Sequence, residues 1–248
     1  MGVVTGPILE DKLAFRLTGS LDRDALQQAL DSIVQRHEVL RTTYKMVSGE
    51  VSQHIDDARP VPIKFLDLQG LDDRTQRERL RQCRQTEAGH VFILSREYPL
   101  RVSLLQLSDS SHVLLVTMHH IASDGWSMGL LVKELSHFYR TYTGGESTPL
   151  APLPVQYADY ASWQRSAASE SALRDRLSYW RQQLEGIPQS HSLVLEKGRP
   201  AQQDFQGAAY EQMLSGEILA GLQGLANTHN ASLFMVLQTA FALLLSRW

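Results

Sequence analysis

The sequence is poor in several features that mark particular classes of protein. It has one cysteine, Cys83, among 248 residues, so it cannot form an intramolecular disulfide, and no second thiol is present to share a zinc ion. We interpret Cys83 as a helix-packing residue. No apolar run reaches the roughly 20 residues that a membrane-spanning helix needs. The longest, residues 233–245, contains Gln238 and Thr239.

Positive charge is not in excess either. The 24 Lys and Arg residues are outnumbered by 27 Asp and Glu residues. A chain without a basic excess has little with which to neutralise phosphates, so we do not expect nucleic acid as a partner. The lack of a long apolar run argues against a membrane. Position 6 is glycine, where an N-myristoylation signal needs Ser or Thr, and no secretory pattern follows. We therefore expect a soluble, cytoplasmic protein.

The pattern of hydrophobic residues predicts alternating strands and helices. Apolar residues alternate with polar ones at 13–17, as in a half-buried strand, and recur every three or four positions at 22–34, as on one face of a helix. Further strands are predicted at 40–46, 51–55, 61–68, 100–107, 113–118 and 208–214. Further helices are predicted at 72–88, 158–163, 171–184, 215–227 and 232–248. Another is predicted to begin at Ser127, as its N-cap, and to stop at Gly144.

Two of these strands can be assigned to positions in a sheet. Residues 113–118 are nearly all apolar, which is typical of a central strand covered on both faces. Pro62 confines the strand at 61–68 to a sheet edge, because proline cannot donate a ladder hydrogen bond. A proline-rich connector follows at 149–154, and the composition changes near Gly186.

Residues 119–127, His-His-Ile-Ala-Ser-Asp-Gly-Trp-Ser, bring several reactive groups into one short loop between a buried strand and a helix. A histidine can take or give a proton near neutral pH, so His120 suits catalysis at a strand end. Asp124 lies four residues later and can turn back toward the strand. Gly125 allows backbone angles, or a close approach, that a side chain would forbid. A buried aspartate needs a partner, and the candidates are Arg36 and Arg41.

Two other interpretations of the same loop remain open. In the first, both histidines are satisfied core residues and Asp124 caps the helix that contains Trp126. In the second, His119, His120 and Asp124 bind a metal ion. The metal site is disfavoured because adjacent strand residues point to opposite faces of a sheet and rarely bind one ion.

Three segments together resemble the condensation domains of nonribosomal peptide synthetases. Residues 119–127 resemble the family's HHxxxDG signature, residues 36–44 resemble its RHExLRTxF segment, and residues 157–163 resemble its YxDYAxW segment. They occur in the family's order. HHxxxDG alone is shared with epimerisation domains, wax ester synthases and related acyltransferases.

The resemblance implies an α/β (α+β) fold built of chloramphenicol-acetyltransferase-like lobes, each with a mixed sheet flanked by helices. Residues 1–175 would form the N-terminal lobe, and residues 176–248 the start of a second, similar lobe that is truncated here. The rest of the C-terminal lobe would lie beyond Trp248, and the family's opening SxAQxRLW pattern is missing before Leu13.

The resemblance also implies a function. The family joins a donor acyl or peptidyl group to an acceptor aminoacyl group through an amide, and both arrive on the phosphopantetheine of peptidyl carrier proteins. The partners would be donor and acceptor carrier proteins and the adjoining adenylation and carrier domains, with no directly bound cofactor and no metal. There are two alternatives. The chain could be a noncatalytic half-domain that docks carrier proteins, or a related ester-forming or epimerising domain. Epimerisation domains continue with Val-Ser-Trp-Arg after the aspartate-glycine pair, unlike residues 126–128 here.

Carried over residue by residue, the resemblance gives each candidate a role. His120 would contact the acceptor amine as base or by positioning it, His119 would be structural within the site, and Gly125 would lie near the thioester. Arg41 is favoured over Arg36 as the partner of Asp124, so Asp124→Asn should destabilise the protein. The catalytic set is His119, His120, Asp124 and Gly125, and the structural or orienting set is Arg36, Arg41, Trp126 and Ser127.

Overall fold

The computed structural model of the chain describes residues 3–4, 13–145, 148–188, 193, 210 and 212–247. These residues divide into two compact units, Met1–Asp175 and Arg176–Trp248. The first unit contains β1 (Val3–Val4), β2 (Leu13–Thr18), α1 (Arg23–Arg36), the 3-10 helix η1 (Glu38–Arg41), β3 (Thr42–Val47), β4 (Glu50–Ile55), β5 (Ile63–Asp67), α2 (Asp73–Ala88), β6 (Leu100–Ser108), β7 (Ser111–Met118), α3 (Gly125–Tyr142) and α4 (Tyr157–Gln164). Helix α5 (Ala167–Gln183) crosses the boundary, and α6 (Gly216–Thr228) and α7 (Leu233–Arg247) belong to the second unit.

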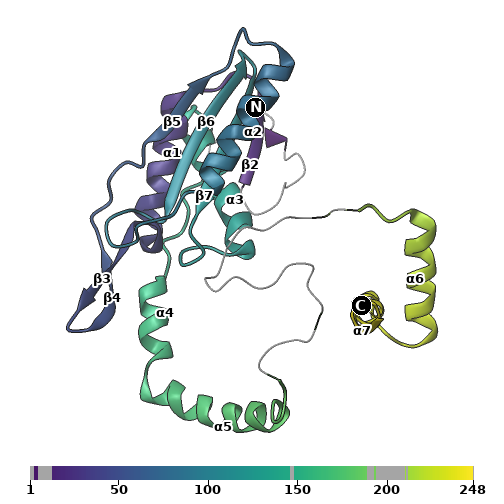
Figure 1. Ribbon diagram of the computed structural model, residues 1–248. Coiled ribbons are helices and arrows are strands. Elements are labelled where there is room, and N and C mark those ends of the chain that lie inside the picture. Colours follow the sequence, from purple (N-terminus) through teal and green to yellow (C-terminus); the bar gives the residue numbers. More distant parts are fainter. Residues whose placement is uncertain are drawn as a thin grey trace. The chain divides into compact units, whose positions relative to one another are not determined.

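The first unit is built on a mixed five-stranded sheet in the order β1-β2-β7-β6-β5 (Figure 1). Neighbouring strands are antiparallel except β5 and β6, which are parallel. The prediction that β7 is central and β5 an edge strand is confirmed. The mixed sheet flanked by helices also confirms the predicted fold class.

Helices cover both faces of this sheet. On one face, α1 and α3 pack against β2, β6 and β7, where Ile33, Leu104 and Leu114 are almost completely buried. Burying each such side chain stabilises the fold by about 1.5–3 kcal/mol. On the other face, α2 packs through Leu80 and Cys83, which confirms the predicted packing role of the cysteine. The central strand β7 is therefore packed on both faces, which fixes the position of its C-terminal end.

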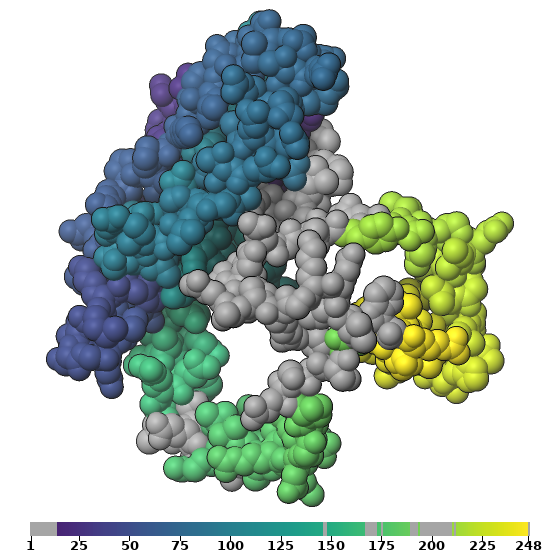
Figure 2. Space-filling view, in the orientation of Figure 1, coloured from purple at the N-terminus to yellow at the C-terminus, as the bar shows by residue number. Residues whose placement is uncertain are grey.

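A separate hairpin of β3 and β4 projects from the first unit, at the lower left of Figure 2. Its turn residues Ser48 and Gly49 both have positive φ, at 54° and 85°, as type I′ hairpin turns require. The 3-10 helix η1 precedes β3, so the strand begins at Thr42, after a helical turn over residues that were predicted to start it.

The second unit contains the two predicted C-terminal helices. Ser215 caps α6, since its Oγ accepts from the Ile218 N–H, and Ser232 does the same at α7 for the Met235 N–H. Residues 208, 209 and 211 of the predicted strand at 208–214 lie outside the described residues, and its described residues, 210 and 212–214, form no strand. Within the described chain, no single helix has the length and hydropathy to cross a membrane; α6 and α7 pass that test only as a pair, bent by 105°.

Candidate active site

The HHxxxDG loop begins where the central strand ends. β7 finishes at Met118, and the N–H of His119 continues toward β6 by donating to the carbonyl of Pro99 at 3.0 Å. The N–H of Ala122 then donates to the His119 carbonyl at 2.9 Å, which closes a turn, and α3 begins at Gly125. The loop is therefore held between a sheet strand and a helix start.

His120 is exposed and has one ring nitrogen engaged. Its Nδ1 lies 3.1 Å from the backbone carbonyl oxygen of Ser123. A carbonyl oxygen can only accept, so Nδ1 carries the hydrogen and donates. In the neutral ring this leaves a lone pair on Nε2. His120 is therefore oriented to accept a proton or a hydrogen bond at Nε2.

His119 has the opposite arrangement. Its Nδ1 accepts the backbone N–H of Ile121 at 3.0 Å, so the hydrogen of the neutral ring is on Nε2. The ring is half-buried and meets the Phe92 ring edge to face, with centroids 5.9 Å apart. These contacts support the structural role expected of His119, which stays a prediction.

Asp124 caps α3. Its Oδ1 accepts from Ser127 twice, from the backbone N–H at 2.8 Å and from Oγ at 2.6 Å, and its own N–H donates back to Ser127 Oγ. This is a reciprocal capping box. The hydrogen bonds from the Ser127 hydroxyl and N–H hold the pKa of Asp124 below its usual value. The prediction that Ser127 is the N-cap is wrong, because Asp124 takes that position and Ser127 lies three residues into the helix.

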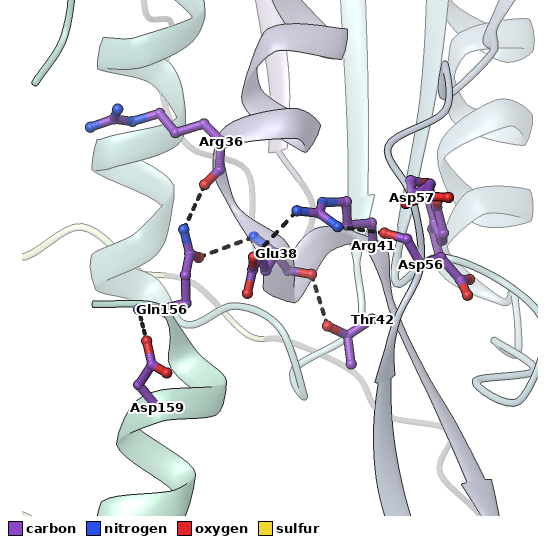
Figure 3. A network of polar contacts seen from close by, with 9 residues as sticks. Arg36, Glu38, Arg41, Thr42, Asp56, Asp57, Gln156 and Asp159 are labelled. Atoms are coloured by element: carbon purple, nitrogen blue, oxygen red, sulfur yellow. Dashed lines mark hydrogen bonds and ion pairs between the residues drawn. The ribbon is translucent and has the colours of Figure 1, made fainter. Parts of the chain in front are cut away.

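The predicted ion pair between Arg41 and Asp124 is also wrong. Arg41 donates to the backbone carbonyl of Asp56 and lies 3.4 Å from Glu38 Oε1 (Figure 3). Asp124 is exposed and already satisfied by Ser127. An exposed carboxylate that is capped locally does not require a distant cation.

Arg36 has a different partner, which the sequence interpretation missed. Its Nε lies 3.1 Å from Oε1 of Glu134, and Oε2 of the same carboxylate is 2.6 Å from His37 Nε2. The Glu134 side chain is only 5% exposed. A signal existed in the sequence, because Glu134 falls three residues after Leu131 on the buried face of α3.

The start of α4 attaches to the same corner of the molecule (Figure 3). The Gln156 side chain donates to the Arg36 carbonyl at 3.0 Å and accepts the Glu38 N–H at 3.2 Å. Asp159 in turn accepts the Gln156 N–H at 2.9 Å. Gln156, the residue before the YxDYAxW segment, thus joins α4 to the end of α1, while Trp163 of that segment is 60% exposed.

The first two residues of α3, Gly125 and Trp126, face open space. Gly125 does not have a left-handed φ, and a Cβ added to it would meet no atom within 4 Å. The fold itself therefore does not require glycine at position 125, and the expected approach of the thioester stays a prediction. Trp126 is 89% exposed, which gives its expected orienting role no packing support.

A pocket of about 100 Å³ lies behind the loop, between η1 and α3. Its lining includes both residues that hold the loop in place, Ser123 and Ser127. The remaining lining residues are Ile33, His37, Val39, Leu40, Met118, Ala122, Leu130 and Leu131. Among the described residues, no three His, Cys, Asp or Glu side chains are grouped as metal ligands.

Comparisons with known proteins agree on one family. A family model described as Condensation domain matches residues 10–248. Malpinin synthetase of Mortierella alpina is 38% identical over 94% of this chain, which covers 3% of that protein. A phosphinothricin tripeptide synthetase of Streptomyces viridochromogenes is 37% identical over 98% of this chain, which covers 22% of that protein.

A solved structure shows the same fold. The complex of the X-domain and OxyB from teicoplanin biosynthesis contains a chain 34% identical to this one, with a TM-score of 0.83 over 96% of this chain. The match covers 51% of that chain. The present chain thus spans about half the length of this structural neighbour and a smaller part of the two synthetases.

Proposed function

The chain belongs to the condensation-domain family, and we propose that it takes part in forming an amide bond between two carrier-bound substrates. The donor would be an acyl or peptidyl thioester and the acceptor an aminoacyl thioester, each on the phosphopantetheine of a peptidyl carrier protein. One observation carries this proposal. His120 lies in the family's signature loop, and its Nδ1 is held by the Ser123 carbonyl, which leaves Nε2 available to the acceptor amine.

The chemistry follows from that orientation. The neutral amine of the acceptor attacks the donor thioester carbonyl, the C–N bond forms, and the C–S bond breaks when the tetrahedral intermediate collapses. His120 Nε2 accepts the hydrogen of the amine and can pass the proton to the leaving thiolate. The N-terminus of α3, which starts at Gly125, supplies a positive dipole end close to the loop for the developing oxyanion.

The test is a condensation assay with two loaded carrier proteins and detection of the dipeptidyl thioester by mass spectrometry. The wild-type chain is expected to form product, and His120→Ala to lower the rate by about 10²-fold or more. His54→Ala is the matched control, because His54 is also an exposed histidine of the first unit but lies on the β3–β4 hairpin. Equal rates in wild type and His120→Ala would refute the role of His120.

A second candidate is a noncatalytic docking module. It is favoured by one observation, that a structural neighbour 34% identical to this chain is described in complex with another protein, OxyB. On this view wild type and His120→Ala would both give no product. Calorimetry with the same carrier proteins would still measure binding, and both versions would bind equally well.

A further inference from the structure

Glu134 is a buried charge in the middle of α3. Its side chain is 5% exposed, and its two oxygens contact two different residues, Arg36 at 3.1 Å and His37 at 2.6 Å. Burying an ionised carboxylate is costly unless it is paired and hydrogen-bonded. Both of its partners lie where α1 ends and η1 begins. The carboxylate thus joins the middle of α3 to that corner of the chain.

His37 also connects this corner to the candidate active site. It lines the pocket of about 100 Å³ together with Ser123 and Ser127. Ser123 is the residue whose carbonyl accepts from His120 Nδ1, and Ser127 is the residue that caps with Asp124. His37, which Glu134 holds, therefore lines the same pocket as the two anchors of the loop.

We propose that Glu134 is a positioning residue for His120, acting through His37 and the pocket behind the loop. The carboxylate fixes the His37 ring at the wall of the pocket, the fixed wall keeps the neighbouring Ser123 carbonyl in place, and that carbonyl keeps the hydrogen of His120 on Nδ1. The effect on rate rests on the proposed condensation reaction. The effect on the His120 ring does not depend on it.

The first measurement is spectroscopic. Protein labelled with ¹⁵N-histidine contains nine imidazole rings, and the His120 signals are assigned by their loss in His120→Ala. Two-bond ¹H–¹⁵N correlations then report which nitrogen is protonated. Wild type is expected to show the Nδ1–H form of His120. Glu134→Ala is expected to shift the ring to a mixture with the Nε2–H form, and Glu134→Gln, whose amide can still bond to both partners, is expected to restore most of the wild-type signal.

The second measurement is kinetic. Glu134→Ala is expected to lower kcat about tenfold or more with little change in KM for either carrier protein, because a displaced catalytic group costs rate more than binding. In a His120→Ala background the same substitution should cause no further loss, since the two residues act in one unit. A role limited to stability would lower both backgrounds by the same factor.

Glu87→Ala is the matched control. Glu87 is also buried and also paired with an arginine, Arg101 at 2.9 Å, but on the opposite face of the sheet. It should destabilise the fold while leaving the His120 signals unchanged. If Glu134→Ala does not fold, His37→Ala removes the same link and keeps the Arg36 ion pair. The proposal would be overturned if folded Glu134→Ala or His37→Ala protein kept the wild-type His120 signals. It would also be overturned if Glu87→Ala shifted the His120 ring toward the Nε2–H form as Glu134→Ala is expected to do.

The two measurements also separate this inference from the proposed function. No condensation by wild type would refute the reaction and with it the expected rate effect. The His120 spectrum would still decide whether Glu134 orients the ring. Condensation by wild type with an unchanged spectrum in both variants would leave the reaction standing and refute the positioning role.

Discussion

Gly125→Ala separates what the fold needs from what the proposed chemistry needs. Gly125 is the first residue of α3, it does not have a left-handed φ, and an added Cβ would meet nothing within 4 Å. Alanine should therefore fit without strain. It should also restrict the unfolded chain, which stabilises a protein by about 0.4–1 kcal/mol when the native conformation is compatible. For a chain of this size, that corresponds to a rise of about 1–4 °C in the unfolding midpoint.

The expected effect on condensation has the opposite sign. If the donor thioester approaches the loop at Gly125, the new methyl group would occupy part of that space, and a displacement of the reacting atoms by about 1 Å can cost up to 10²-fold in rate. Thermal unfolding and the two-carrier assay on the same preparation measure both quantities. We expect a more stable protein that condenses at least about tenfold more slowly.

Gly129→Ala is the matched control for this experiment. Gly129 lies one turn further along α3, and an added Cβ there also meets nothing within 4 Å. It should stabilise the protein to a similar extent and leave the rate unchanged. A wild-type rate in Gly125→Ala would refute the approach of substrate at this glycine. A lower unfolding midpoint would show that the backbone argument is wrong.

The remaining predictions concern Asp124 and Glu87, two of the carboxylates whose pKa the structure lowers. Asp124→Ala should reduce the thermal unfolding midpoint by a few degrees. Because Asp124 caps α3 and does not pair with Arg41, Asp124→Asn should not destabilise the protein as the ion pair implied, since asparagine is an equally good N-cap. Burial opposes ionisation of Glu87, but Arg101 and Ser103 together hold its pKa below its usual value. The stabilisation that ionised Glu87 gives to the folded protein is therefore complete above about pH 4.5, near the pKa of an unfolded glutamate. It is lost as the pH falls through the lower pKa that Glu87 has in the folded protein. Urea unfolding should show Glu87→Gln less stable than wild type by about 1–3 kcal/mol at pH 7, with the difference shrinking at pH 3; a constant difference would contradict the linkage.

Local periodicity was enough to predict most of the described fold. Helices α1 and α2 and strands β5, β6 and β7 lie within a few residues of their predicted ranges, because each has an apolar face with a clear period. The misses are short or local features. The turn η1 spans four residues, too few to show a period, so a strand was predicted to begin within it.

The long-range polar contacts were harder to predict. Arg41 was assigned to Asp124 on family grounds, although Glu38, three residues before it, and the Asp56 carbonyl lie within its reach. The pairing of Glu134 with Arg36 and His37 joins residues almost a hundred positions apart. A charged residue on an apolar helix face signals that some partner exists. Sequence alone does not say which one, because the partner depends on how the helices pack.

The loop that carries the candidate chemistry is held mainly by its own neighbours. His119 accepts from the N–H two residues later, His120 donates to the carbonyl three residues later, and the Asp124 side chain accepts from the serine three residues later. Contacts over so few residues cost little chain entropy, so they form in preference to distant pairs. The hydrogen bonds that orient both histidine rings therefore lie within residues 119–127. Tertiary structure holds the two ends of that segment, at the end of β7 and the start of α3. The role proposed for Glu134 is to keep the Ser123 carbonyl, through His37, where the His120 ring needs it.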